Sequence, residues 1–254
     1  MITHTAAFKT YRDLSQAHLN FVVLACHSVP FLKTQLQVPA AILPTPDHFK
    51  GHGNTVQAIL GFIDNYQEEL ARSTLITVFS YFEAYLKSVL QEVIEFHGGQ
   101  VQFQKKAKDR AERFFASATT MIEKNKRKLQ DAPDPNKRPK YEKYSQLLDE
   151  AGFRFPTDLL SHFGVKQLVL KADEKRGFKA YEIPSVIEDA LLYPLTVQNK
   201  EMLERIRLER NKIAHGEAAG QTLAQSLSDA SFLHTLAAKV DDHIARHFLL
   251  IQQF

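Results

Sequence analysis

Cysteine, glycine and proline are all scarce in this chain of 254 residues. The single cysteine, Cys26, excludes an intrachain disulfide and any zinc or iron–sulfur site built from several cysteines. Ten glycines and ten prolines are few for a turn-rich β fold, and they favour long helices. Because 44% of the residues are hydrophobic and only 24% are charged, we expect a folded core rather than global disorder.

Long hydrophobic runs are missing as well. No apolar stretch approaches the roughly 18–20 residues that cross a bilayer, and the first residues lack the basic-then-apolar layout of a signal peptide. We therefore expect a cytoplasmic protein without a membrane partner. The net charge is only +3, so any affinity for nucleic acid must come from local clusters of basic residues.

Several common catalytic patterns are also absent. The chain has no Gly-rich phosphate loop, no sequence context of a Ser/His/Asp triad and no paired catalytic carboxylates. His243 and His247 lie four residues apart beside two aspartates, which is half of a zinc-site pattern. Because no third ligand stands at a recognisable spacing, we interpret them as residues at the edge of an apolar helix face. We predict no metal and no other cofactor.

What the sequence does contain is helical periodicity. Apolar residues recur at three- and four-residue spacing from 55 to 96, where Gly98 and Gly99 follow. The same pattern predicts helices over about 196–214 and 221–251. Residues 8–37 predict one helix or a broken pair, followed by a proline-rich stretch. We find no internal repeat and no alternation typical of a β-strand.

These patterns predict an all-α protein, an antiparallel up-down helical bundle with a helical, basic insertion. We expect residues 51–99 and 195–254 to form the two halves of the bundle. Residues 1–50 would be an N-terminal helical extension with a proline-rich crossing segment. Residues 100–194 would be the insertion, with short helices near 141–151, 156–171 and 184–192.

Lysine and arginine crowd the first part of this insertion, residues 105–143. Such a cluster can follow an RNA backbone by neutralising phosphates. The residues with the highest local density, and our candidates for RNA binding, are Lys124, Lys126, Arg127 and Lys128. Aspartate and glutamate are interspersed among the basic residues, so a solvated helical face remains an equal alternative.

The strongest candidate for a functional site is Arg210-Asn211-Lys212-Ile213-Ala214-His215. It falls at the end of a predicted helix and is followed by Gly216. Arg210 and His215 are five residues apart, about one and a half turns, so a straight helix does not stack them. The two side chains would converge only if the helix frays near His215, or if a second copy of the helix supplies the partner.

A guanidinium and an imidazole together suit chemistry on a phosphodiester. Arginine can hold two phosphate oxygens at once and offset charge that develops in the transition state. Histidine can move a proton on the attacking or the leaving oxygen near neutral pH. RNA carries its own nucleophile, the 2′-hydroxyl, so this chemistry requires no metal.

At these residues the chain resembles the HEPN superfamily, particularly its RiboL-PSP-HEPN branch. The superfamily's hallmark is an arginine, a polar residue and then a histidine after four to six intervening positions. Here the polar residue is Asn211, and the local sequence Arg-Asn…Ala-His-Gly is typical of the family. A second likeness is the string Phe82-Glu83-Ala84-Tyr85-Leu86 on the preceding core helix. The resemblance covers about 55–97 and 195–251.

The resemblance implies a helical bundle that forms a homodimer along its motif helices, so that two Arg/His sets face one RNA-cutting cleft. Arg210 would bind phosphate, His215 would act in acid–base catalysis, and Asn211 would orient one of them. Glu83 and Lys212 are secondary candidates. The resemblance also implies a toxin or an anti-phage defence effector, with an antitoxin or another defence-system protein as its partner.

Three alternatives stay open at this point. Arg12 and His18 also have the spacing of the motif, but the residues around them differ from the family's typical sequence and they do not lie at a helix end. The chain could instead be a catalytically inactive HEPN-like module that binds a protein, nucleotides or RNA. A regulatory, antitoxin-like RNA-binding protein that uses residues 105–143 is the third reading.

Overall fold

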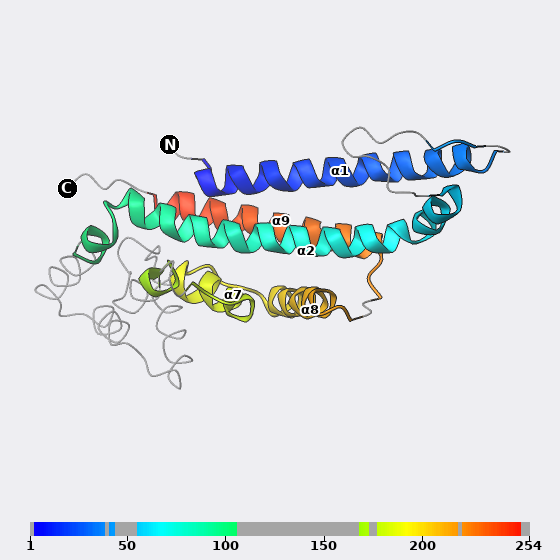
Figure 1. Ribbon diagram of the computed structural model, residues 1–254. Helices are drawn as coiled ribbons and strands as arrows, with labels where there is room; N and C mark the ends of the chain where they lie inside the picture. Colours follow the sequence, from blue (N-terminus) through cyan, green and yellow to red (C-terminus); the bar gives the residue numbers. More distant parts are fainter. Residues whose placement is uncertain are drawn as a thin grey trace, which may run out of the picture. The chain divides into compact units, whose positions relative to one another are not determined.

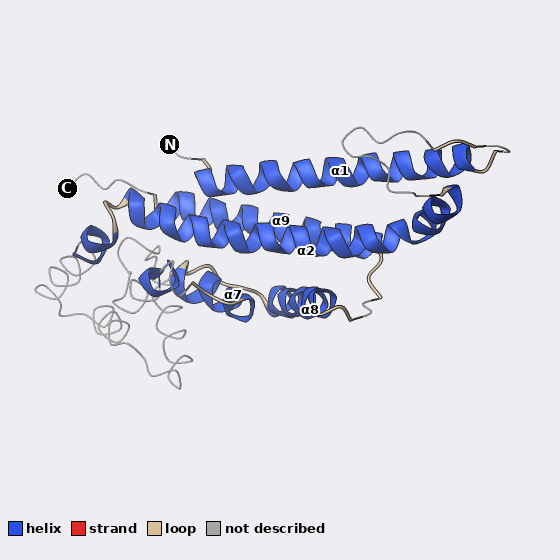
Figure 2. Ribbon diagram, viewed as in Figure 1, coloured by secondary structure: helices blue, strands red, loops and turns tan. Residues whose placement is uncertain are grey.

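The computed structural model describes residues 3–38, 41–43, 55–105, 168–172, 177–217 and 220–249 (Figure 1). Within these ranges the chain is helical and contains no strand (Figure 2). The predicted all-α fold is therefore confirmed. None of the helices in the described ranges is long and apolar enough to span a membrane. The predicted extension, bundle halves and insertion stay a prediction, because much of 100–194 lies outside the described residues.

Four long helices account for most of the described chain, and their bounds follow the apolar periodicity closely. They are α1 (Ala6–Leu36), α2 (Val56–Phe96), α8 (Val197–Ala214) and α9 (Leu223–His247). The predicted short helix near 184–192 is instead a succession of the 3₁₀ turn Ala180–Glu182, the α-helical turn Ile183–Ser185 (α7) and the π-helical turn Val186–Ala190. The chain thus changes its hydrogen-bonding pattern twice within eleven residues.

The first helix, α1, is continuous although Pro30 lies inside it. A proline within a helix removes one backbone hydrogen bond and costs about 3 kcal/mol relative to alanine. The inward face of α1 offsets this cost, since Tyr11, Val22 and Leu36 are all buried. Of the two arrangements predicted for 8–37, the structure therefore contains the single helix.

The helices are organised as two compact units, and each long helix contributes to both. One unit is drawn from Met1–Tyr11, Phe82–Glu204 and Thr235–Phe254, and the other from Arg12–Tyr81 and Arg205–His234. The second unit contains the motif at 210–215, so its internal contacts position the candidate site.

In the first unit, side chains from α2 and α9 form hydrogen bonds at the N-terminus of α1. The hydroxyl of Thr5 accepts a hydrogen bond from the amide of Phe8 (3.0 Å), and the carboxylate of Glu92 accepts from the amides of Ala6 and Ala7 (both 2.9 Å). These acceptors satisfy amide groups that have no partner within the first turn of a helix. The buried carboxylate of Asp241 accepts from Thr5, and burial raises the pKa of Asp241.

In the same unit, α2 and α9 run parallel. The hydroxyl of Tyr85 donates to the carbonyl of Ala237 (3.3 Å), and Nε2 of His97 lies 2.7 Å from the carbonyl oxygen of Phe248. Between these two points the facing positions of α2 are fully buried aliphatic residues, Leu86, Val89, Leu90 and Val93. Burying such side chains stabilises the fold by about 1.5–3 kcal/mol each.

In the second unit, α1 runs antiparallel to α2. Nε2 of His18 lies 3.3 Å from the hydroxyl of Thr74, and Lys33 pairs with Asp64 at 2.6 Å, so the two helices progress in opposite directions. On another side of α2, the hydroxyl of Ser226 from α9 donates to the carbonyl of Ala71 (2.8 Å). The core of this unit contains buried apolar residues of α2, α8 and α9: Leu75, Val78, Phe79, Ile206 and Leu233.

Candidate functional site

An ion pair between α8 and α9 fixes the helix that carries the motif. The guanidinium of Arg205 on α8 donates to the carboxylate of Asp229 on α9, and the side-chain amide of Gln221 donates to the same carboxylate at 3.0 Å. Asp229 is only 1% exposed. A buried carboxylate is tolerated only when donors surround it. The pair therefore holds the end of α8 at a defined place against α9.

We expect Asp229→Ala to lower the free energy of unfolding by about 2–3 kcal/mol, because charge-assisted hydrogen bonds in a mostly buried setting contribute on this scale. Urea unfolding followed by circular dichroism measures the loss. Asp242→Ala is the matched control, since Asp242 lies on the same helix and pairs with Arg246 at 2.9 Å but is half exposed. The control should cost no more than about 1 kcal/mol. Equal losses in the two variants would contradict a special role for Asp229.

Arg210 lies five residues, about one and a half turns, farther along α8 than Arg205 and is half-buried. Its guanidinium carbon is 5.8 Å from the centre of the Phe79 ring on α2, which is a cation–π distance. Its Nη1 also donates to Oδ1 of Asn211 at 3.2 Å. The structure thus brings together two of the three predicted motif residues, and Asn211 contacts Arg210. These contacts limit the orientations that the guanidinium can adopt.

His215 lies at the C-terminus of α8, where it is exposed to solvent. Its amide donates to the carbonyl of Asn211 (3.0 Å), so helical hydrogen bonding continues up to this residue. Beyond it, the amide of Gly216 donates to Ile213 (3.0 Å) and the amide of Glu217 donates to Lys212 (2.9 Å). These two hydrogen bonds form a Schellman motif, which requires the left-handed backbone conformation of Gly216 (φ +76°).

Because the helix does not fray, Arg210 and His215 leave α8 in different directions. Five residues at about 100° each separate their side chains by about 140° around the helix axis. Arg210 is directed toward Phe79, whereas His215 is exposed at the helix end. The helix geometry of one chain therefore does not stack the guanidinium and the imidazole, as the five-residue spacing predicted.

The two secondary candidates have different surroundings. Lys212 is exposed and pairs with Glu209 at 2.8 Å, and this hydrogen bond raises the pKa of Lys212. Its positive charge is thus partly offset by a carboxylate one turn earlier on the helix. Glu83 is half-buried on the part of α2 that belongs to the other unit, beside the fully buried Phe82. In the string 82–86, the aromatic and leucine residues are core residues.

The alternative match to the motif spacing consists of Arg12 and His18, whose surroundings differ from those of Arg210 and His215. Arg12 is exposed and contacts the neighbouring Asp13 at 3.4 Å, and His18 lies against Thr74 in the middle of α1. Burial lowers the pKa of His18. The four basic residues proposed for RNA binding, Lys124, Lys126, Arg127 and Lys128, lie outside the described residues.

The rings of His243 and His247 contact each other in a tilted arrangement, with their centres 4.7 Å apart and their planes at 54°. Nε2 of His243 lies 3.0 Å from the carbonyl oxygen of Leu191, and burial lowers the pKa of His243 to about 4. This ring is therefore neutral at pH 7. In the part of the chain that the structure describes, no three His, Cys, Asp or Glu side chains are grouped so that they could hold a metal ion.

Two residues that position the motif were missed from the sequence. Phe79 is one of the apolar residues that recur from 55 to 96, and nothing in that pattern identifies it as the ring that Arg210 contacts. Asp229 did carry a signal, because it stands one turn before the buried Leu233, on the apolar face of α9. An acid on an apolar helix face indicates a partner that crosses from another helix.

Comparison with known proteins shows the family to which the chain belongs. The model of the RiboL-PSP-HEPN family matches residues 48–246, which is well over half of the chain and includes α2, α8 and the motif at 210–215. No curated protein and no solved structure matches the chain. HEPN domains suggest a nuclease or another RNA-related role, and they often dimerise. The chain belongs to the RiboL-PSP-HEPN family.

Proposed function

We propose that this protein is a metal-independent endoribonuclease that cleaves RNA through attack of the 2′-hydroxyl on the adjacent phosphate. The observation that carries the proposal is the arrangement at the end of α8. A guanidinium held against Phe79 and Asn211 is followed, after five residues, by an exposed imidazole. Family membership supplies the RNA-related setting.

Arg210 is suited to phosphate because its position is fixed in advance. The contacts with the Phe79 ring and with Asn211 restrict the guanidinium before any substrate arrives. Donors that need no reorganisation stabilise developing negative charge more effectively than mobile donors. Arg210 would therefore bind two oxygens of the scissile phosphate, and Asn211 would orient Arg210 rather than His215.

His215 is suited to proton transfer because it is accessible. Its side chain is exposed at the end of α8, so an RNA strand can reach it without displacing a core residue. The imidazole would accept the proton of the 2′-hydroxyl or donate a proton to the leaving 5′-oxygen. The products would be one strand that ends in a 2′,3′-cyclic phosphate and one that begins with a free 5′-hydroxyl.

The site is best completed by a second chain. The side chains of Arg210 and His215 point about 140° apart on one unbroken helix, so they are not stacked for joint action within that helix. In a symmetric dimer, each copy presents the same surface to the other, and Arg210 of one chain can approach His215 of its partner. We propose that the motif ends of two α8 helices form this composite site.

Product chemistry tests the proposal directly. Purified protein should cleave single-stranded RNA in excess EDTA and leave 2′,3′-cyclic phosphate ends, which mass spectrometry identifies. An RNA with 2′-O-methyl groups throughout should resist cleavage, because the internal nucleophile is blocked. Activity that disappears in EDTA and returns with zinc or manganese would refute the mechanism and redirect attention to His243 and His247.

The exposure of His215 also favours a second candidate, a module that binds RNA or a protein without cutting. In this reading His215 caps α8 and contributes favourably to the helix dipole. The biological setting we propose for the nuclease is a toxin or an anti-phage defence effector, and its partner would be an antitoxin or another defence protein. RNA binding without cleavage in the EDTA experiment would support the silent module instead.

A further inference from the structure

The outer face of α1 presents an apolar stripe to solvent. Four large apolar residues lie on it at spacings of seven, three and seven: Leu14, Phe21, Leu24 and Phe31. Val38 continues the series two residues beyond the end of the helix and completes the stripe. Phe21, Leu24 and Phe31 are 57%, 62% and 67% exposed. A repeat of seven with an internal step of three is the pattern by which one helix packs along another. Isolated exposed apolar residues are ordinary on a surface, but a stripe at this spacing indicates a binding surface.

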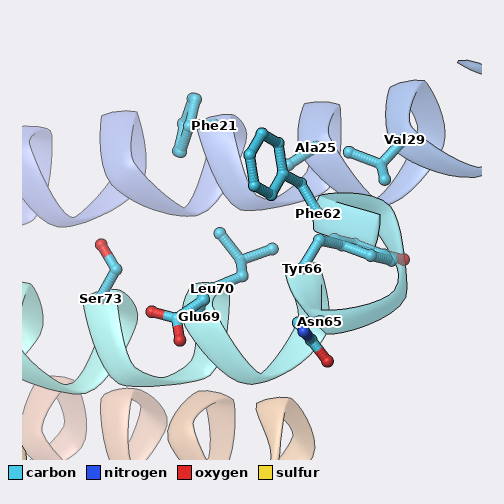
Figure 3. A pocket seen from close by; sticks show the side chains of 9 residues that line it. All are labelled: Phe21, Ala25, Val29, Phe62, Asn65, Tyr66, Glu69, Leu70 and Ser73. Atoms are coloured by element: carbon cyan, nitrogen blue, oxygen red, sulfur yellow. The ribbon is translucent and has the colours of Figure 1, made fainter. Parts of the chain in front are cut away.

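Phe21 of the stripe also lines a groove between α1 and α2 (Figure 3). The groove has a volume of about 620 Å³. Phe21, Ala25 and Val29 line it from α1, and Phe62 and Leu70 line it from α2. Figure 3 shows Leu70 pointing toward α1, and the Phe62 ring reaching the level of the α1 ribbon near Ala25. Phe62 is itself 64% exposed, so the mouth of the groove is apolar on both sides. A surface of this form accepts the apolar side chains of a further helix.

Several charged side chains near the stripe and the groove are paired with each other. The ion pairs are Arg12 with Asp13 (3.4 Å), Lys33 with Asp64 (2.6 Å), and Arg72 with Glu68 and Glu69 (2.5 and 2.8 Å). RNA binding requires unpaired positive charge to replace counterions on the phosphates. Because an acid accompanies each of these cations, the surface suits a neutral, apolar protein partner rather than a nucleic acid.

The order of the residues fits a second copy of the chain as that partner. Leu14 and Val38 are equally distant from residue 26, and so are Phe21 and Phe31. If α1 pairs antiparallel with α1 of a second copy, centred at residue 26, Phe21 meets the partner's Phe31. Leu14 then lies opposite the partner's Val38, just beyond the end of the partner's α1. A contact with twofold symmetry requires this reciprocal matching of residues.

We propose that the α1 stripe is a self-association surface, on which α1 of a second copy binds antiparallel. The exposed parts of the five stripe residues and Phe62 offer on the order of 700 Å² of apolar surface, close to the roughly 800 Å² that each partner contributes to a standard interface. This surface uses none of the motif residues, so it is additional to the composite site proposed above and does not depend on it.

Disulfide cross-linking tests the register. In full-length Cys26→Ser protein, Phe21→Cys and Phe31→Cys are made separately and oxidised alone or mixed. Antiparallel pairing brings position 21 of one chain opposite position 31 of the other, whereas two copies of position 21 lie about 15 Å apart along the helix, beyond disulfide reach. We expect at least about ten times more cross-linked dimer in the mixture than in either variant alone. Stronger cross-linking of the single variants would mean parallel pairing and would overturn the proposal.

A second measurement does not depend on cysteine chemistry. Phe21→Glu combined with Phe31→Glu should halve the mass measured by sedimentation equilibrium, while helix content by circular dichroism stays unchanged. Gln16→Glu combined with Thr34→Glu is the control, because both residues are exposed on α1 outside the stripe. An unchanged mass in the Phe21/Phe31 variant, with no cross-link in the mixture, would overturn the proposal. The stripe would then be a binding surface for a different protein.

Discussion

His215→Ala and Arg210→Ala are each expected to lower the rate of RNA cleavage by at least about a hundredfold, the usual contribution of a positioned acid–base group. His215→Ala removes the group that moves the proton. Arg210→Ala removes the guanidinium that lies over Phe79 and leaves the developing charge on the phosphate without its donor. Initial rates on a fluorescent single-stranded RNA, with equal concentrations of folded protein, measure both losses.

The control variants for this experiment are Arg12→Ala and His18→Ala, because these residues show the same bare pattern on α1. We expect both to cleave at close to the wild-type rate. Circular dichroism and urea unfolding should show that the Arg210 and His215 variants remain folded, since His215 is exposed and Arg210 is only half-buried. Undiminished cleavage by either motif variant would remove that residue from the catalytic site.

Co-expression of Arg210→Ala with His215→Ala is expected to restore activity that neither variant has alone. If each site takes Arg210 from one chain and His215 from the other, a mixed dimer contains one intact site and one site that lacks both groups. Random assembly makes half of the dimers mixed, so the preparation should reach about a quarter of wild-type activity. This is a gain of at least about 25-fold over either single variant, given a hundredfold loss in each.

The comparison needs two further preparations. Mixing the two purified proteins without subunit exchange should give no gain, because each dimer then lacks the same residue on both chains. A co-expressed pair of Arg210→Ala with the Arg210→Ala/His215→Ala double variant should also remain inactive, since it contains no Arg210. If co-expression of the two single variants restores nothing while wild-type protein is active, the site lies within one chain and the composite arrangement is wrong.

The helices were predictable because their signal is local. The apolar spacing over 55–96 and 196–214 predicted α2 and α8 to within a residue at each end, since an amphipathic helix must repeat its apolar side chains every three or four positions. The end of α8 could also be placed, because Gly216 supplies the left-handed conformation that closes a helix. The residue types at 210–215 predicted the family, and the match to the family model confirms this prediction. The catalytic roles of those residues remain a prediction.

The surroundings of the motif were not predictable in this way. Which ring lies beside Arg210, and which cation meets Asp229, depend on how helices far apart in the sequence pack together. A helix pattern specifies which face is buried, but not which residue of another helix that face will contact. For the same reason, the sequence left open whether residues 8–37 form one helix or two. Local helix propensity disfavours Pro30 within a helix, but the buried contacts of Tyr11, Val22 and Leu36 keep α1 continuous. The sequence alone thus determined the helices, their ends and the chemistry at 210–215. Only the tertiary structure decided what holds Arg210 in place and which face of α1 stays exposed, because both depend on long-range packing.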